Sequence, residues 1–429
     1  MSEPLLDLVR RHRADPAVGI ASVCSAHPLV VEAAVAQALD DGGPLLVEAT
    51  SNQVDQFGGY TGMRPGDFRD LVTGIADRAG LPRERVLLGG DHLGPNRWRA
   101  LGAAEAMRRA EELVAGYVEA GFCKIHLDTS MACAGDPAPL TDAHVAERAA
   151  RLARVAEESA RHVGQSPVYV IGTEVPVPGG AQENIEGLEP TSPEAAARTI
   201  EAHRHAFDAA AVGDAWQRVV GLVVQPGVEF DHHHVVDYDR RHTKALTAVL
   251  DDRPGMVFEA HSTDYQNTDS LAALVEDRWA ILKVGPWLTF ALREGLFALA
   301  AIEDELVAPH ARSRLVDVVE QTMLAKPEWW QDYYRGGADQ QRLARRYSYS
   351  DRIRYYWSDP AVAEAQDRLL ANLDDIAIPL PLISAHLPQQ YEPVRRGELS
   401  ASPRDLVVHR VRGVLAAYSR ACGRLPAFP

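Results

Sequence analysis

The residues best suited to chemistry in this chain are two histidines and several polar side chains that each follow a short apolar run. His92 follows RVLLGG together with Asp91, and His261 follows MVFEA. Neutral imidazoles at rigid strand ends are typical ligands of zinc or a similar divalent cation. Glu174 and Gln225 end further apolar runs and could complete an open site. We therefore predict a divalent-metal site with His92, His261, Gln225 and Glu174 as ligands, Zn²⁺ first and Mn²⁺, Co²⁺ or Mg²⁺ as alternatives. The competing interpretation is that each histidine is only a hydrogen-bonded residue.

Three carboxylates are candidates for catalytic work beside this metal. Asp91 could act as a general base on a substrate hydroxyl, or it could orient a ligand histidine from behind, and both roles stay open. Asp128 alternates with His126 in KIHLD, so the two share a face of their strand; the alternative to a catalytic Asp128 is a buried polar pair. Glu174 is the third candidate.

Further polar residues at the same positions are predicted to contact the substrate. Lys283, late in AILKV, could form a Schiff base, but a metal is another way to stabilise an enolate. The histidines favour the metal and leave Lys283 as an electrostatic contact. The N–H of Gly285 is a candidate phosphate donor. The other predicted substrate contacts are Asn52, Gln53, Ser130, Asp264, Arg352 and Arg354.

Eight apolar runs must position these side chains, and they begin about 25 to 50 residues apart, the size of a strand–loop–helix unit. Between them, segments such as Ala104–Val118 repeat apolar residues at the helical period. The sequence therefore predicts an α/β fold, a (β/α)8 TIM barrel over 1–307, whose chemistry gathers at the C-terminal ends of the strands. An open doubly wound sheet is the alternative, although the first βα turn has no GxGxxG. The runs are 19–25, 44–49, 85–90, 124–128, 168–173, 219–224, 256–260 and 280–284.

The chain changes character after about residue 308. Aromatic and basic residues become dense, and helical patterns lie near Ala361–Asp374 and Pro403–Ser419. No low-complexity linker precedes them. We expect a helical C-terminal extension over 308–429 that packs on the barrel rather than moving freely.

Composition narrows the class of protein. The 429 residues are 46% hydrophobic and 24% charged, as in globular proteins, with a formal net charge of −16. An acidic surface disfavours nucleic acid as a partner, and the lack of an apolar run of about 18 residues disfavours a membrane span. The N-terminus has no signal-peptide pattern, and the four cysteines form no CxxC pair. We expect a cytoplasmic protein with reduced thiols.

Six segments, taken together, resemble a known family. They are EATSNQVDQFGGYTGM, GGDHLGPNRW, KIHLDTSM, GTEVPVPGG, EAHSTDYQ and YSYSDRIRYYW. The chain resembles the second subunit of class II D-tagatose-1,6-bisphosphate aldolase, the so-called non-catalytic or chaperone-like subunit, over essentially its whole length. The resemblance implies a TIM barrel and a role in carbohydrate metabolism.

The resemblance leaves two functions open. Some members of the family are accessory subunits that stabilise a separate class II aldolase. Others are metal-dependent 4-epimerases that interconvert ketoses or ketose phosphates of the fructose and tagatose type. The epimerase is the preferred interpretation here, and self-association into a homo-oligomer is compatible with either. A kinase is disfavoured because the sequence has no GxxxxGK[ST] phosphate loop.

The wider class II aldolases provide a template for the site. Their Asp-His pair, strand-five glutamate and late histidine are matched by Asp91-His92, Glu174 and His261. Gln225 stands where those aldolases have a further histidine. Residues 262–264, Ser-Thr-Asp, replace their phosphate-binding glycines. The resemblance therefore implies a related metal site with a different phosphate pocket.

Overall fold

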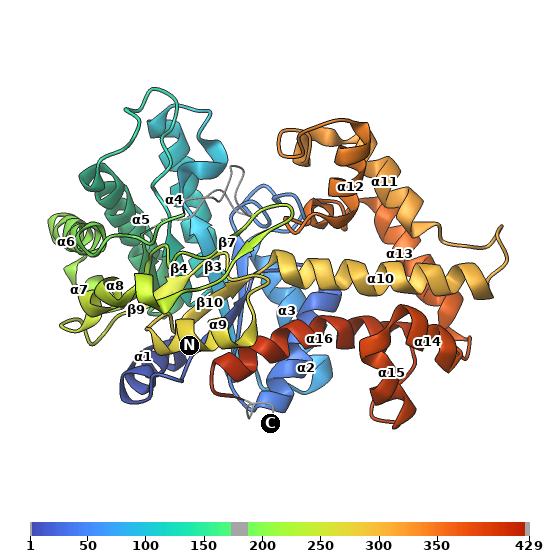
Figure 1. Cartoon of the computed structure of the whole chain (residues 1–429). Coiled ribbons are helices and arrows are strands. Elements are labelled where there is room, and N and C mark those ends of the chain that lie inside the picture. Colours follow the sequence, from blue (N-terminus) through green and yellow to red (C-terminus); the bar gives the residue numbers. More distant parts are fainter. Residues whose placement is uncertain (1, 173–187, 425–429) are drawn as a thin grey trace.

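Eight parallel strands close into a barrel at the centre of the molecule (Figure 1). The structure is a computed structural model that describes residues 2–172 and 188–424. Around the barrel the strand order is β1-β10-β9-β6-β5-β4-β3-β2, so the predicted (β/α)8 TIM barrel is confirmed. The strands are β1 (Ile20–Val23), β2 (Leu45–Thr50), β3 (Val86–Leu93), β4 (Lys124–Leu127), β5 (Val168–Ile171), β6 (Val219–Val223), β9 (Val257–Ala260) and β10 (Ile281–Val284).

Each strand lies within or close to one of the predicted apolar runs, because a strand covered on both faces must be apolar nearly throughout. The exception is β3, which continues beyond Gly90 to include Asp91, His92 and Leu93. A small hairpin of β7 (Glu229–Phe230) and β8 (Val235–Val236) interrupts the series after β6, with three consecutive histidines in its turn.

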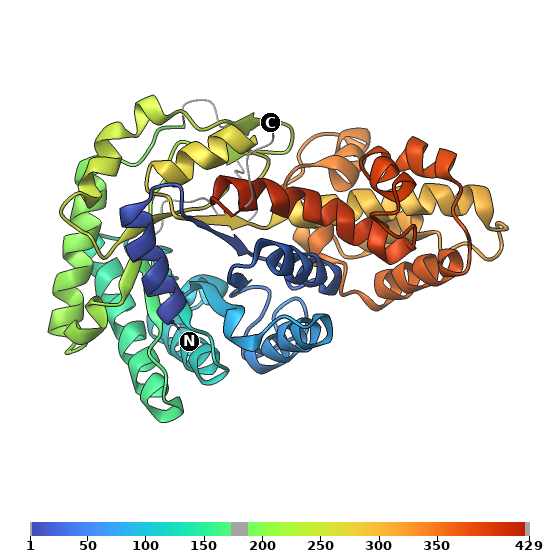
Figure 2. The same cartoon turned by 90° about the horizontal axis from the view of Figure 1, so that it is seen from below.

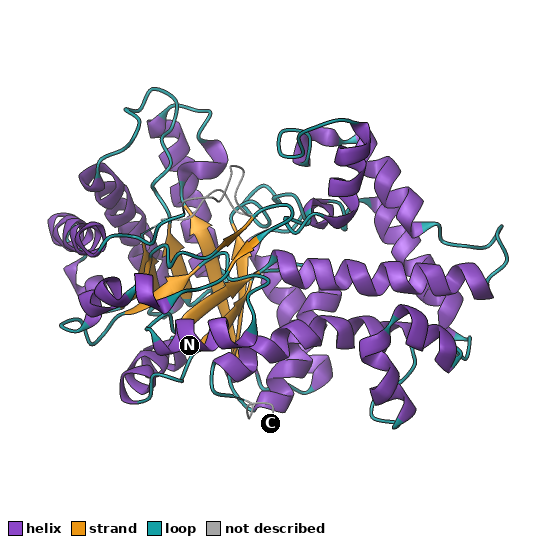
Figure 3. Ribbon diagram, in the orientation of Figure 1, coloured by secondary structure: helices purple, strands orange, loops and turns teal. Residues whose placement is uncertain are grey.

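Amphipathic helices surround the barrel (Figure 3). In α4, the apolar side chains Met107, Leu113 and Val114 are buried, as their helical spacing predicts. Thr141 and Ser192 cap α5 and α6 by accepting backbone N–H groups. The helices of this layer are α2 (Pro28–Asp41), α3 (Pro65–Ala79), α4 (Ala103–Glu119), α5 (Asp142–Val163), α6 (Pro193–Ala209), α7 (Gly213–Trp216), α8 (Lys244–Thr247), α9 (Thr268–Glu276) and α10 (Pro286–Leu306).

The N-terminal end of the barrel is closed by α1 (Glu3–Ala14), which is seen against the strands from below in Figure 2. Leu5, Leu8 and Val9 of this helix form one apolar cluster with the first inward residues of the strands. We call this cluster the apolar plug. Its other members are Ile20, Leu46, Leu87, Cys123, Val168, Val220, Val257, Ala280 and Ile281.

A group of helices follows the barrel and lies to one side of it (Figures 1 and 2). The last of them, α16, returns to pack against α2, α9 and α10. Arg404 of α16 forms an ion pair with Glu32 of α2, and Tyr418 donates to the backbone carbonyl of Thr263 at 2.9 Å. The elements of this group are α11 (Leu315–Ala325), α12 (Ala338–Tyr347), the 3-10 helix η6 (Arg352–Tyr355), α13 (Pro360–Asp374), α14 (Leu380–His386), α15 (Pro388–Arg395) and α16 (Pro403–Ala421).

Two further observations concern the class of protein. Among the helices that the structure describes, none has the length and apolar character needed to cross a bilayer. All four cysteines belong to the described residues, and all four carry free thiols.

Candidate metal centre and active site

The end of β3 turns two neighbouring side chains toward the barrel mouth. On a regular strand, Asp91 and His92 would point to opposite faces. The pairing of β3 with β4 shifts register between Gly90 and Leu93, and His92 has a φ of 50°, in the left-handed region. Such a conformation costs about 1–3 kcal/mol at a non-glycine residue and is often found at functional sites. The irregularity allows both side chains to line the same cavity.

Four side chains converge at this mouth. Asp91, His92, His126 and His261 each offer one ligand atom, and these atoms all lie within 4.8 Å of one another. The ring of His92 is centred 4.9 Å from that of His126 and 4.9 Å from that of His261. The structure thus brings together the two histidines predicted as ligands and adds a third from β4.

Each of the three imidazoles is oriented by an oxygen that contacts one ring nitrogen. The second nitrogen of His92 and of His261 is left for the cluster, whereas Nδ1 of His126 accepts the backbone N–H of His92 at 3.2 Å. The contacts are His92 Nδ1 with Asp128 Oδ2 at 2.9 Å, His126 Nε2 with the carbonyl of Gly172 at 3.0 Å, and His261 Nε2 with Glu259 Oε1 at 2.9 Å. An oxygen acceptor fixes a proton on the nitrogen it contacts, so the second nitrogen carries the lone pair. This arrangement is typical of histidines that bind metals. Two such imidazoles, with His126 and the carboxylate of Asp91 beside them, fit zinc or a similar divalent cation.

The protonation of the histidines follows from burial and neighbouring charge. Burial lowers the pKa of His261 to about 4 against the opposing effect of Glu259, so this ring is neutral at pH 7. Burial would also lower the pKa of His92, but Asp91 and Asp128 outweigh it and raise the value. A metal ligand must be unprotonated, and His261 already meets that condition.

Below the imidazoles, the barrel interior holds four charged side chains, Glu48, Lys124, Glu259 and Lys283, which we call the ionic floor. Lys124 Nζ lies 2.7 Å from Glu48 Oε1 and 2.7 Å from Glu259 Oε2, and all three side chains are 0% exposed. Lys283 Nζ lies 2.7 Å from Glu48 Oε2 and 2.6 Å from Asp91 Oδ1. The ionic floor therefore links two glutamates of the interior to the carboxylate of the mouth.

The charges of the ionic floor set its chemistry. Burial would lower the pKa of Lys283, but Asp91, Cys24 and Glu48 outweigh it and raise the value well above the usual one. A lysine that stays protonated is a poor nucleophile, which disfavours the Schiff-base alternative. Likewise, burial would raise the pKa of Asp91, but His92 and Lys283 hold it well below its usual value.

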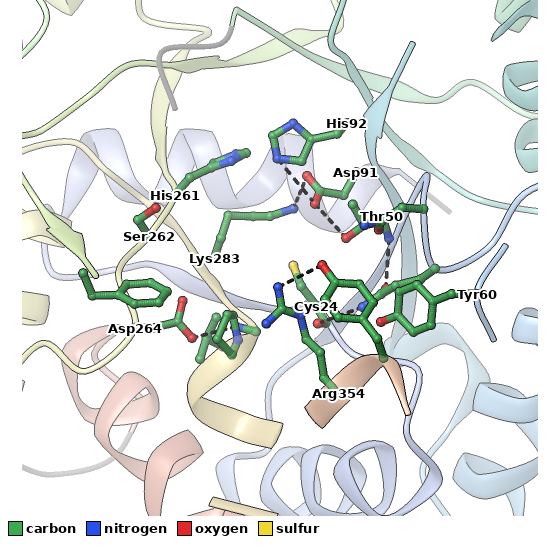
Figure 4. A pocket seen from close by; sticks show the side chains of 17 residues that line it. Cys24, Thr50, Tyr60, Asp91, His92, His261, Ser262, Asp264, Lys283 and Arg354 are labelled. Carbon is green, nitrogen blue, oxygen red and sulfur yellow. Dashed lines mark hydrogen bonds and ion pairs between the residues drawn. The ribbon is translucent and has the colours of Figure 1, made fainter. Parts of the chain in front are cut away.

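The cavity at the mouth is shown in Figure 4. His92, His261, Asp91 and Lys283 lie on one side of it, and Arg354 reaches it from the C-terminal helices. Of the predicted site residues, Asn52, Gln53, Asp91, His92, His261, Asp264, Lys283 and Arg354 line this cavity.

Comparison with known proteins gives the family. A family model described as D-tagatose-1,6-bisphosphate aldolase subunit GatZ/KbaZ-like matches residues 5–423. The chain belongs to the GatZ/KbaZ-like family. Its sequence is 53% identical to a protein of known structure from Sinorhizobium meliloti 1021, described as a probable tagatose 6 phosphate kinase. That match has a TM-score of 0.88 and covers 94% of this chain and 100% of the other.

More distant structures share less with this GatZ/KbaZ-like chain. The fructuronate-tagaturonate epimerase UxaE from Cohnella laeviribosi is 13% identical, with a TM-score of 0.46, over 95% of this chain and 81% of the other. A fructose-bisphosphate aldolase from Campylobacter jejuni is 14% identical, with a TM-score of 0.43, over 87% and 93%.

Three other predicted site residues of this GatZ/KbaZ-like chain, Asp128, Ser130 and Gln225, are not part of the cavity lining. Asp128 stands behind His92, and Ser130 donates to Asp128 Oδ1 at 2.9 Å, so both help to orient a candidate ligand. Gln225 is not among the described residues that line the cavity, and its side-chain oxygen accepts the N–H groups of Gly227 and Val228. Glu174 lies outside the described residues.

The two predicted arginines, two residues apart in η6, have different surroundings. The guanidinium of Arg352 lies over the ring of Tyr333, 3.2 Å from its centroid, and donates to the carbonyl of Trp329. Only Arg354 of the pair lines the cavity. The positive charge that the basic segment brings to the mouth therefore comes from Arg354.

Sequence reasoning missed His126 as a candidate ligand. Its alternation with Asp128 in KIHLD was visible, but that pattern also fits a buried polar pair. Thr50, which donates to Asp91 Oδ2 at 3.2 Å, and Tyr60, which lines the cavity, were missed as well. Their residue types carry no specific signal, and only the fold shows that they face the mouth.

Proposed function

We propose that this chain is a metal-dependent epimerase that inverts C4 of a ketose or ketose phosphate of the fructose and tagatose type. The observation that carries the proposal is the convergence of three oriented imidazoles and Asp91 in a cavity at the C-terminal end of the barrel strands. A scaffold that only stabilises a partner needs no such convergence. Membership of an aldolase-subunit family supports sugar chemistry.

The proposed reaction is a retro-aldol cleavage followed by re-addition. Asp91 accepts the proton of the C4 hydroxyl, because among the carboxylates that contact an imidazole it is the one that lines the cavity. The C3–C4 bond breaks, C4 becomes an aldehyde carbon, and the bonding pair passes to the ketone half as an enediolate. A divalent cation held by His92 and His261, beside His126, would polarise the ketone and stabilise this negative charge.

Inversion then requires the aldehyde to stay in the cavity. It turns its other face to the enediolate, the C3–C4 bond forms again, and Asp91 returns the proton to the C4 oxygen. Protonated Lys283, 2.6 Å from Asp91, holds that carboxylate in position through both steps. An aldolase would release the aldehyde instead, so retention distinguishes the two outcomes.

Two other functions are weaker candidates. The family description favours an accessory subunit that stabilises a class II aldolase. The description of the 53% identical relative suggests a kinase, but this sequence has no GxxxxGK[ST] loop. We place the epimerase in the cytoplasm, where its four free thiols would stay reduced.

The test uses the purified full chain alone, stripped of metal and reloaded with Zn²⁺, Mn²⁺, Co²⁺ or Mg²⁺. We expect it to interconvert fructose and tagatose or their 6-phosphates. His92→Ala should remove bound metal and lower kcat/KM by about a thousandfold or more, since the cation supplies several kcal/mol of transition-state stabilisation.

His234→Ala is the matched control, because this exposed histidine lies in the β7–β8 turn. It should leave metal content and activity unchanged. The epimerase proposal fails if the metal-loaded chain is inert on every ketose while it stabilises a co-expressed aldolase.

A further inference from the structure

The start of α10 carries a carboxylate of the protein itself. Asp264 Oδ1 accepts the backbone N–H of Gly285 at 3.0 Å and that of Trp287 at 2.8 Å. Gly285 is the N-cap of this 21-residue helix. Free N–H groups and the helix dipole make such an end an anion site. In this chain the carboxylate of Asp264 already accepts two of these N–H groups.

Asp264 also faces the substrate cavity. Its residue is 3% exposed, yet it is part of the cavity lining, on the side where His261 and Ser262 lie (Figure 4). Among the described residues, no other group donates a hydrogen bond to its second oxygen, Oδ2. This oxygen can accept a hydroxyl of a bound sugar. Burial raises the pKa of Asp264 to about 6, against the two N–H groups and the charge of Arg354, so most of this carboxyl is ionised at pH 7.

The cavity has its own unpaired cation. Arg354 donates to the backbone carbonyls of Ser350 and Asp351 and, at 3.0 Å, to the hydroxyl of Tyr355. None of the carboxylates that the structure describes lies within ion-pair distance of its guanidinium. Lys283, the other cation of the lining, is already paired with Glu48 and Asp91. An anionic substrate group would therefore bind at Arg354.

We propose that Asp264 and Arg354 select substrates by the charge at the two ends of the sugar. The sugar end that meets α10 is an uncharged hydroxyl bound by Asp264, and a single anionic group, where the ketose carries one, binds at Arg354. Ketose bisphosphates are excluded, because a second phosphate would meet a buried carboxylate and find the N–H donors of Gly285 and Trp287 taken. This inference rests on the proposed function for its substrate class.

Inorganic phosphate tests the inference without reference to turnover. Calorimetric titration of the metal-loaded wild type should show one phosphate site, which Arg354→Met weakens at least tenfold. Asp264→Ser frees the two N–H groups and removes the charge, so a second phosphate site should appear, with an affinity at least tenfold above that of any second site in the wild type. Asp264→Asn removes the charge but keeps an acceptor for the N–H groups, and it should show a smaller gain.

Asp269→Ser is the matched control, because it removes one exposed carboxylate at the start of α9. It should bind phosphate as the wild type does. The inference is overturned if neither folded Asp264 variant binds phosphate better than this control. Since the readout is binding, a second site in Asp264→Ser supports the inference even if every protein proves inactive as an epimerase.

Discussion

The two ends of the barrel are built on the same strands, yet they bury opposite kinds of side chain. At the N-terminal end, α1 and the first inward residues form the apolar plug. One layer further along, the inward residues form the ionic floor below three imidazoles. The change occurs within two residues on one face of three strands. The pairs are Leu46 and Glu48, Val257 and Glu259, and Ile281 and Lys283.

Burial alone therefore does not distinguish residues that stabilise the fold from residues that are suited to chemistry. Both layers exclude solvent, and Lys124 is as inaccessible as Leu46. Burying apolar side chains lowers the free energy of the folded state. The charged layer costs free energy of desolvation, and this cost is offset only if every ion keeps its partners. The charged layer lies toward the C-terminal end of the strands, which is the end where TIM barrels carry their active sites. Substitutions in the two layers should therefore differ in their effects.

The largest effect on stability is expected where the two layers meet. Lys124→Met would leave Glu48 and Glu259 short of a partner at 2.7 Å each. Breaking a buried ion pair in this way should lower the free energy of unfolding by about 3–5 kcal/mol. Urea unfolding measures it. Adding Glu48→Gln should recover part of the loss, and a Lys124→Met protein as stable as the wild type would contradict the partner requirement.

A smaller loss, with no change in chemistry, is expected in the apolar plug. Leu46→Ala removes a fully buried side chain one layer below Glu48 and should cost about 2–4 kcal/mol through lost burial and a cavity. Bound metal per folded molecule and kcat/KM should match the wild type. If Leu46→Ala lowered metal affinity at unchanged folded fraction, the two layers would not be independent.

The smallest effect is a pH dependence at the N-terminal end. His12 of α1 is buried, and its Nδ1 lies 2.8 Å from the carbonyl of Val18. Burial lowers its pKa below the ordinary 6.5, against the hydrogen bond to Val18. The unfolded chain therefore takes up this proton more readily, and stability falls as the pH drops below 6.5, by at most about 1.4 kcal/mol per pH unit.

Thermal unfolding between pH 7 and 5 measures this dependence. The variant His12→Gln, which cannot titrate, should show a shallower loss than the wild type. Equal slopes for the two proteins would show that α1 contributes no acid sensitivity.

Much of the fold could be predicted because a barrel strand is apolar on both faces. For this reason the predicted run 44–49 matches β2 to within one residue at each end. The meeting of His92 and His261 could be expected too, since the C-terminal ends of all eight strands share one rim. The strand positions and the meeting of the two histidines follow from the pattern of apolar residues and from the rule that the C-terminal strand ends of a barrel share one rim.

The rest depends on contacts that the local sequence does not contain. Asp264 accepts two N–H groups at the start of a helix, and these groups are 21 and 23 residues away in the sequence. Gln225 turns back to accept the N–H groups of its own loop. Arg352 and Arg354 are alike in type and two residues apart, but Arg352 packs on Tyr333 and donates to Trp329, whereas Arg354 lines the cavity. Whether Glu174 joins the metal site stays a prediction.

Arg354 and Tyr355 enter the mouth from beyond the last barrel helix. In the proposed function the barrel would supply the reacting groups, and the segment that follows it would supply part of the selectivity. Two relatives could thus exchange residues 308–424 and trade preferences among sugars while each kept its own metal ligands. Directed evolution of new specificities should begin in that segment rather than in the strands.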